Sequence, residues 1–164
     1  MGFSAVRAHL IGRVRAATPH RAAEDHPFVC EEDGSGRVPA LTRLAGRVRP
    51  RSFDLRVAEG GWPRDDGAAG DSTRRLRASL VLRVAYPLDG DRADLEAMIA
   101  EDFDTLTTAL MTAPTAAGWG AAGGVTVDPP ELSDTEPLVP PRSGDEAEPV
   151  AIAVSLAFDV TYWE

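Results

Sequence analysis

The side chains that could do chemistry are few, and the densest group of them lies near the N-terminus. His20, Glu24, Asp25, His26 and Cys30 fall within one short stretch, and all are residue types that coordinate metal ions. A structural zinc site needs four ligands, normally in two closely spaced pairs. The spacing His-x5-His-x3-Cys does not match that arrangement, and no fourth ligand is evident. We therefore predict no metal site and interpret both histidines as loop residues beside acidic neighbours.

A glycine-rich segment, 118–123, reads Gly-Trp-Gly-Ala-Ala-Gly and formally fits the dinucleotide-binding pattern G-x-G-x-x-G. That pattern requires a strand before the turn and a helix after it, so that the helix N-terminus meets the pyrophosphate. Here the predicted order is reversed, with a helix before the segment and a short strand after it. We predict a helix-to-strand connection anchored by Trp119, and no bound cofactor.

Other catalytic apparatus is also missing from the sequence. G-x-S-x-G, H-E-x-x-H and EF-hand patterns do not occur, and every basic residue is arginine, which excludes lysine chemistry. Cys30, the single cysteine, has no evident base beside it and is interpreted as an incidental thiol in a loop. Asp102 falls inside an apolar helical stripe, and we expect it to be hydrogen-bonded to an arginine or tyrosine of the sheet. The alternative is an enzyme using Asp102 with His20 or His26, but we predict that the protein is not an enzyme.

Charge is distributed unevenly along this chain of net charge −9. Residues 1–57 carry ten arginines against six acidic residues, whereas residues 58–164 carry seven arginines against twenty. An acidic chain argues against sequence-specific nucleic-acid binding, although a local arginine patch could still meet an acidic protein surface. We expect no membrane association, because no apolar run approaches the ~18 residues of a membrane span, and the N-terminus lacks the pattern of a secretory signal.

Hydrophobic periodicity predicts the elements that position these residues. Residues 3–17 and 91–112 have helical spacing, with Ser4 as a possible N-cap and Pro19 ending the first helix. Alternating patterns predict strong strands over 74–86 and 150–163, and weaker strands over 47–58 and 125–127.

The remaining segments are predicted to be flexible connections, 19–46, 59–73 and 128–149, with a short strand near 37–44 in the first. We predict one domain, 1–164, with an α+β fold. Its antiparallel or mixed sheet is packed by a long central helix and an N-terminal helix.

The two strong strands also suggest a surface for assembly. Arg75, Arg77 and Arg83 share one face of the first strand, and on the second strand the face opposite the large apolar residues is mostly small. A stripe of small residues suggests that something packs closely there, either the N-terminal helix or another subunit. The predicted subunit or tube interface therefore consists of Arg75, Arg77, Arg83, Ala151, Ala153 and Ser155. A solvated sheet face is the alternative for the arginines.

The order of these features resembles the tail terminator, or tail completion, proteins of long-tailed phages, with counterparts in gene transfer agents and contractile phage-tail-like particles. The resemblance rests on spaced residues and not on a signature motif. They are the strand Arg77–Tyr86 with Pro87, then Asp91-Arg92 and the helical positions Leu95, Ile99, Asp102, Leu106 and Leu110, then Trp119, and finally Phe158-Asp159-Val160-Thr161-Tyr162.

The resemblance implies a subunit of a ring, typically a hexamer, that caps the tail tube, ends its polymerisation and joins the tail to the head or neck. It implies contacts with the chain's own copies, a tail tube protein and a neck or head connector protein. The protein would be assembled in the bacterial cytoplasm and reside in the virion or particle, without catalysis or cofactor. Two alternatives remain: another head–tail connector or neck subunit, and a small-ligand-binding regulatory domain.

Overall fold

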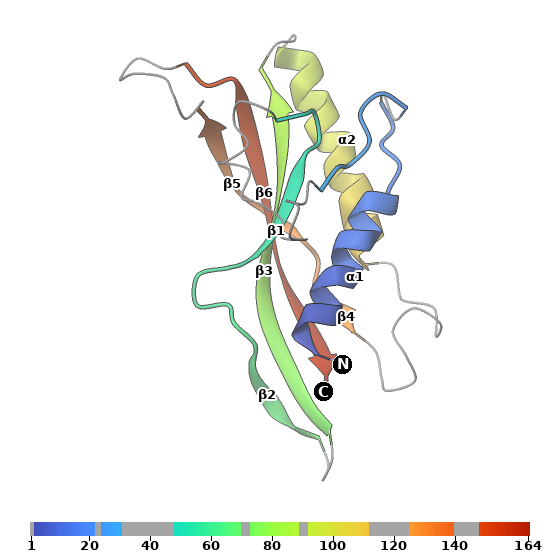
Figure 1. Cartoon of the computed structure of the whole chain (residues 1–164), viewed down its shortest axis with the longest axis vertical. Coiled ribbons are helices and arrows are strands. Elements are labelled where there is room, and N and C mark those ends of the chain that lie inside the picture. The colour runs from blue at the N-terminus through green and yellow to red at the C-terminus, as the bar shows by residue number, and fades with distance from the viewer. Residues whose placement is uncertain are drawn as a thin grey trace, which may run out of the picture.

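The computed structural model of the chain describes residues 2–21, 24–30, 48–69, 73–88, 92–111, 125–139 and 148–164 (Figure 1). Within these ranges the fold is α+β, as predicted, with two helices and a six-stranded sheet. The elements in chain order are α1 (Phe3–Ala16), β1 (Phe53–Val57), β2 (Arg64–Ala69), β3 (Thr73–Pro87), α2 (Arg92–Met111), β4 (Thr126–Val127), β5 (Glu131–Leu138) and β6 (Ala151–Trp163).

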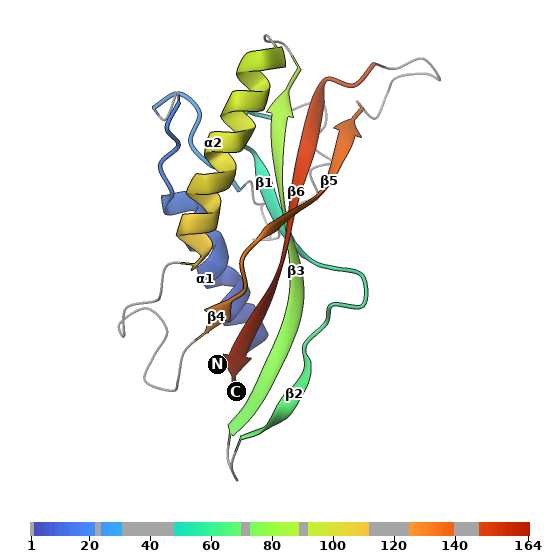
Figure 2. The ribbon, with the colours of Figure 1, turned by 180° about the vertical axis from the view of Figure 1, so that it is seen from behind.

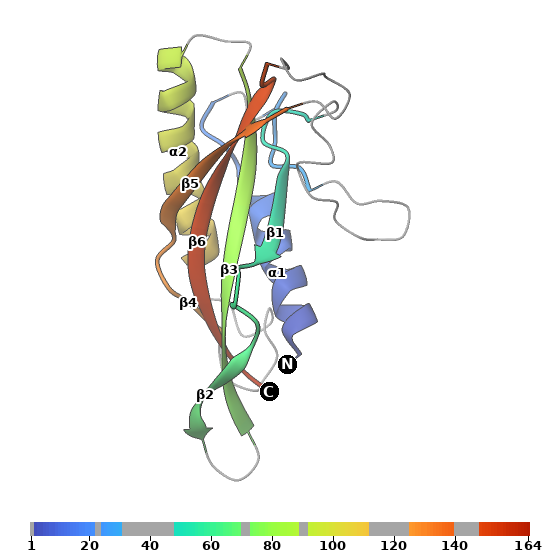
Figure 3. The same ribbon diagram turned by 90° about the vertical axis from the view of Figure 1, so that its left-hand side faces the viewer.

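Two long strands, β3 and β6, form the centre of the sheet. They pair antiparallel from Arg75↔Trp163 to Pro87↔Ala151. The shorter strands β1 and β2 pair with the outer side of β3, whereas β4 and β5 pair with the outer side of β6, all antiparallel. Figure 3 shows β1 and β5 on opposite sides of the central pair. The sheet therefore has two edges built from different strands.

Both helices lie against the same face of the sheet, as Figures 2 and 3 show. The alternation of a strand sends every second side chain of β3 and β6 toward the helices, where these residues form the main core. From α1, Val6, Leu10 and Val14 are at most 1 % exposed, which is the predicted stripe. Arg13 of α1 donates a 3.0 Å hydrogen bond to the carbonyl of Leu110, one of the last carbonyl groups of α2, which have no hydrogen-bond partner within the helix.

Two local predictions were wrong in detail. Ser4 does not cap α1, because the cap position is Gly2 and no side chain bonds there. The strand predicted over 47–58 begins only at Phe53, since Arg51 adopts a φ of 58°, which interrupts the extended backbone.

Two segments predicted to be flexible connections contain strands instead. β2 lies within 59–73 and β5 within 128–149. Both pairings contain a register shift, and β5 is exposed along nearly its whole length. These edge strands are held by backbone hydrogen bonds to a neighbour, so neither shows the alternation that burial of one face would produce. The predicted strand near 37–44 and the glycine-rich segment 118–123 lie outside the described residues.

Candidate functional site: a buried network, a charged sheet face and two unlike edges

Asp102 is the centre of a buried polar network. Its side chain is fully buried, and its Oδ2 accepts hydrogen bonds from Arg51 Nε at 2.6 Å and from the Tyr86 hydroxyl at 3.1 Å. The predicted hydrogen bonding to an arginine or tyrosine is therefore confirmed, with one partner of each type. Arg51 lies just before β1, at a separation of 51 residues along the chain.

The network joins segments that are distant in the sequence. The Nη1 of Arg51 donates to the carbonyls of Arg21 at 2.7 Å and His26 at 3.0 Å, and its guanidinium lies 5.8 Å from the Phe28 ring centroid. Burial, and then the adjacent Asp102 carboxylate, raise the pKa of Tyr86 well above its ordinary value, so the phenol stays a neutral donor. These contacts give Asp102 a structural role, since the network joins α2 and β3 to the backbone carbonyls of Arg21 and His26.

The residues of the candidate metal cluster differ in their surroundings. Within the described ranges, no group of three or more histidine, cysteine and carboxylate side chains is arranged to hold a metal ion. His20 is exposed, whereas His26 takes part in the Arg51 network through its backbone carbonyl. Cys30 lies outside the helices and strands, as predicted, and its side chain is buried in the main core, only 5 % exposed. Neither α1 nor α2 has the length and apolar content that a bilayer-spanning helix needs.

The predicted arginine face lies on the side of the sheet away from the helices, and each of its arginines contacts an acidic residue. Arg77 Nη2 lies 2.7 Å from Asp159 and 2.9 Å from Asp128, and Arg83 Nη2 lies 2.7 Å from Glu136. Arg75 Nε is 3.3 Å from Asp66.

One of these partners, Asp159, has a shifted pKa. Partial burial alone would raise the pKa of its carboxyl, but hydrogen bonds from Ser79 and Arg77, together with the charge of Arg77, lower it below the ordinary value. The carboxylate therefore stays ionised, and its ion pair with Arg77 persists, over the neutral and mildly acidic range.

The small-residue stripe is already covered within the chain. Ala151, Ala153 and Ser155 are 2 %, 0 % and 6 % exposed, and the two alanines pack with Ala85 and Leu138 in a second, smaller core. The alternative in which the N-terminal helix packs on this stripe is wrong, because α1 lies on the opposite face.

The six predicted interface residues therefore differ in accessibility. Arg83 has a side chain only 8 % exposed, whereas the side chains of Arg75 and Arg77 are 47 % and 36 % exposed. Arg75 and Arg77 remain available to a partner, and their role in an interface remains a prediction.

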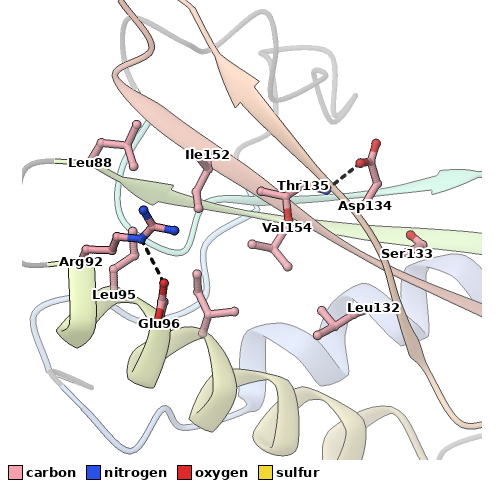
Figure 4. Close-up of a pocket in the computed structure, with 11 residues that line it drawn as sticks. Leu88, Arg92, Leu95, Glu96, Leu132, Ser133, Asp134, Thr135, Ile152 and Val154 are labelled. Atoms are coloured by element: carbon pink, nitrogen blue, oxygen red, sulfur yellow. Dashed lines mark hydrogen bonds and ion pairs between the residues drawn. The ribbon is translucent and has the colours of Figure 1, made fainter.

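A groove of about 770 Å³ opens between α2 and β5, at the β5 edge of the sheet (Figure 4). Its walls are largely apolar, and Arg92, Glu96 and Asp134 add charge. Its apolar lining consists of Leu88, Leu95, Ile99, Leu132, Ile152 and Val154. We call this feature the α2–β5 groove. Sequence reasoning missed it, because the segment that supplies Leu132 and Asp134 was predicted to be a loop.

The other edge of the sheet carries an exposed tryptophan. Trp62, in the turn between β1 and β2, is 69 % exposed, and its ring centroid lies 6.3 Å from that of Phe3 in α1. Phe3 in turn stacks on Tyr162 at 6.2 Å. The preceding residue must be glycine, since a Cβ on Gly61 would lie 2.6 Å from the carbonyl oxygen of Ser79. The turn therefore holds Trp62 in a defined place beside α1.

Comparison of the chain with known protein families, with curated proteins and with solved structures gives no match.

Proposed function

We propose that the chain is a structural subunit that assembles into a ring, a hexamer, at the end of a phage-type tail tube. The ring would end tube polymerisation and join the tail to the head or neck. The resemblance in sequence supports this proposal. Its helical positions Leu106 and Leu110 face the core from α2, and Phe158 and Tyr162 face the core from β6.

The observation that carries the proposal is the difference between the two sheet edges. The β1–β2 edge presents Trp62, whereas the β5 edge presents the α2–β5 groove and a strand whose only charged residues are acidic, namely Glu131, Asp134 and Glu136. A two-fold dimer uses one patch that matches itself. Two unlike patches instead favour head-to-tail contacts, which close into a ring when the rotation between subunits permits.

The remaining partners follow from the same role. The sheet face that carries Arg75 and Arg77 lies away from the helices and offers paired charges of both signs. We propose that this face meets the tube protein or an adjacent subunit, where charge pattern sets orientation more than affinity. The proposed location is the virion or a phage-tail-like particle, after assembly in the bacterial cytoplasm.

The direct test is the mass of the purified protein in solution by light scattering, alone and with short tail-tube assemblies. We expect a hexamer-sized species, or a monomer that forms rings only at tube ends. A strict monomer that ignores tubes would remove the proposal. Binding to a neck or connector protein in place of the tube would favour the alternative of a different head–tail connector.

A second candidate, a small-ligand-binding regulatory domain, is favoured by the α2–β5 groove. Its volume falls within the range of roughly 300–1,000 Å³ that ligand pockets occupy. This function predicts a monomer or dimer whose melting temperature rises with one small molecule in a screen, because a ligand that binds only the folded state stabilises it. A ring-forming protein with no such ligand would exclude it.

A further inference from the structure

We propose that Trp62 of one subunit inserts into the α2–β5 groove of the next copy of the chain, so that each subunit donates a tryptophan at one edge and accepts one at the other. This inference rests on the proposed ring function and names the contact that would build the ring.

The groove is suited to receive an apolar side chain from another subunit. Leu88 and Leu132 on its walls are 42 % and 56 % exposed, although both are large apolar side chains. Figure 4 shows that Ile152 and Val154 of β6 lie between α2 and β5, at the base of the groove. An apolar hollow with exposed leucines on its walls gains stability when another apolar group displaces its water.

Trp62 is suited to insert into a groove of another subunit. Among the exposed large apolar residues of the described ranges it is the most exposed, at 69 %. One side of it is supported by Phe3, and Gly61 holds the preceding turn against Ser79 through a 2.9 Å backbone hydrogen bond. The tryptophan is therefore placed before any partner arrives, which lowers the entropic cost of binding. Tryptophan is also among the residues most enriched at the energetic centres of protein interfaces.

The positions of Trp62 and the groove indicate that the groove is filled by a second copy of the chain. Trp62 belongs to the side of the sheet formed by β1 and β2, and the groove to the side formed by β5. Because donor and acceptor lie at opposite edges, a subunit that has donated its Trp62 still has a vacant groove, and the contact can repeat around a ring.

Charges beside the two features are complementary. Three charged residues line the groove, and two of them, Arg92 and Glu96, pair with each other at 3.1 Å. The third, Asp134 of β5, is exposed. Two residues after Trp62, β2 begins with Arg64, which is exposed. Arg64, which arrives with the tryptophan, would face the Asp134 carboxylate, and this attraction would help to fix the orientation of the two subunits.

The test uses two full-length variants, each of which removes one half of the contact. Trp62→Ala deletes the donor but keeps the groove, whereas Leu132→Arg obstructs the groove but keeps the donor. Each variant by itself is expected to assemble with an affinity at least 10-fold lower than that of the wild type, both without and with short tail tubes. An equimolar mixture of the two variants is expected to form dimers. In that mixture one intact contact remains, between Trp62 of the Leu132→Arg subunit and the groove of the Trp62→Ala subunit.

Met111→Ala is the matched control, since Met111 is 43 % exposed on α2 but does not line the groove. It is expected to assemble like the wild type, and unchanged melting temperatures would show that all three variants fold. If wild type and Trp62→Ala assemble equally, this inference is overturned while the ring function stands. If the wild type stays monomeric with and without tubes, both are overturned.

Discussion

At the residue scale, the stability of the protein depends on the pairing of Asp102 with Arg51. Both side chains are completely buried, so water cannot solvate either charge, and each is stabilised by the opposite charge of its partner. Replacing one member of such a pair costs far more than breaking a pair at the surface, because an uncompensated charge remains inside the protein.

We therefore expect Asp102→Ala to lower the free energy of unfolding by ~3–5 kcal/mol. Tyr86→Phe, which removes only a neutral donor to the same carboxylate, is expected to lower it by about 0.5–1.5 kcal/mol. Urea unfolding would measure both changes. Asp104→Ala, at an exposed position of the same helix, is the control and should change stability by no more than ~0.5 kcal/mol. Equal effects of Asp102→Ala and Asp104→Ala would contradict the role of the buried pair.

A second residue-scale prediction concerns alkaline pH. The chain has two tyrosines. Burial raises the pKa of both, with contributions from Asp102 at Tyr86 and from Glu164 at Tyr162. A raised pKa in the folded state gives stability that is complete below the unfolded value of about 10 and is lost as the pH rises toward the folded value. Near-ultraviolet absorbance should therefore show tyrosinate forming at higher pH in the folded protein than in the unfolded chain. Tyr86 should ionise at a higher pH than Tyr162. Titration of both phenols near pH 10 with the fold intact would refute this.

At the element scale, β5 is a strand with little side-chain anchoring. It is exposed from Glu131 to Thr135, and its one fully buried side chain, Leu138, packs with Ala85, Ala151 and Ala153. The strand also forms one wall of the α2–β5 groove, so its position controls the groove.

Leu138→Ala is expected to destabilise the protein by roughly 2–5 kcal/mol, the usual range for deleting a buried leucine. Hydrogen exchange should quicken first in the amides of β5, because the anchor of that strand is lost. Leu132→Ala, in the same strand but 56 % exposed, should leave both stability and exchange nearly unchanged. Similar exchange in the two variants would show that Leu138 does not hold the strand.

At the scale of the whole molecule, the charged sheet face should influence assembly. Reversing the charges of Arg75 and Arg77 to glutamate removes their attraction to acidic partners and adds repulsion. We expect weaker ring formation that becomes less different from wild type as salt rises, because salt screens exposed charges. Light scattering at low and high salt would measure this.

The control for that experiment is Arg21→Glu, since Arg21 is similarly exposed, at 47 %, but pairs with Glu101 of α2 on the helix side of the molecule. Rings that form equally in wild type and in the double variant, at both low and high salt, would remove the arginine face from the interface. Melting temperatures must accompany the comparison, because Arg77 also pairs with Asp159 and Asp128 inside the chain.

The sequence by itself determined the elements whose side chains carry a regular period. α1, α2, β3 and β6 were all predicted, and so was the hydrogen bonding of Asp102, because a carboxylate inside an apolar stripe must find a polar partner. Such patterns lie in contiguous residues, and they can therefore be recognised without knowing what packs against them.

Only the tertiary structure decided the rest. β2 and β5 form because β3 and β6 offer backbone groups for pairing, and the preference of a side chain for a strand depends on whether that strand lies at an edge. Arg51 meets Asp102 across 51 residues of chain, a partnership that no local spacing encodes. The exposure of Trp62 and the opening of the α2–β5 groove likewise depend on which strands become the edges. These features arise from long-range backbone pairing, and periodicity within one segment cannot predict that pairing.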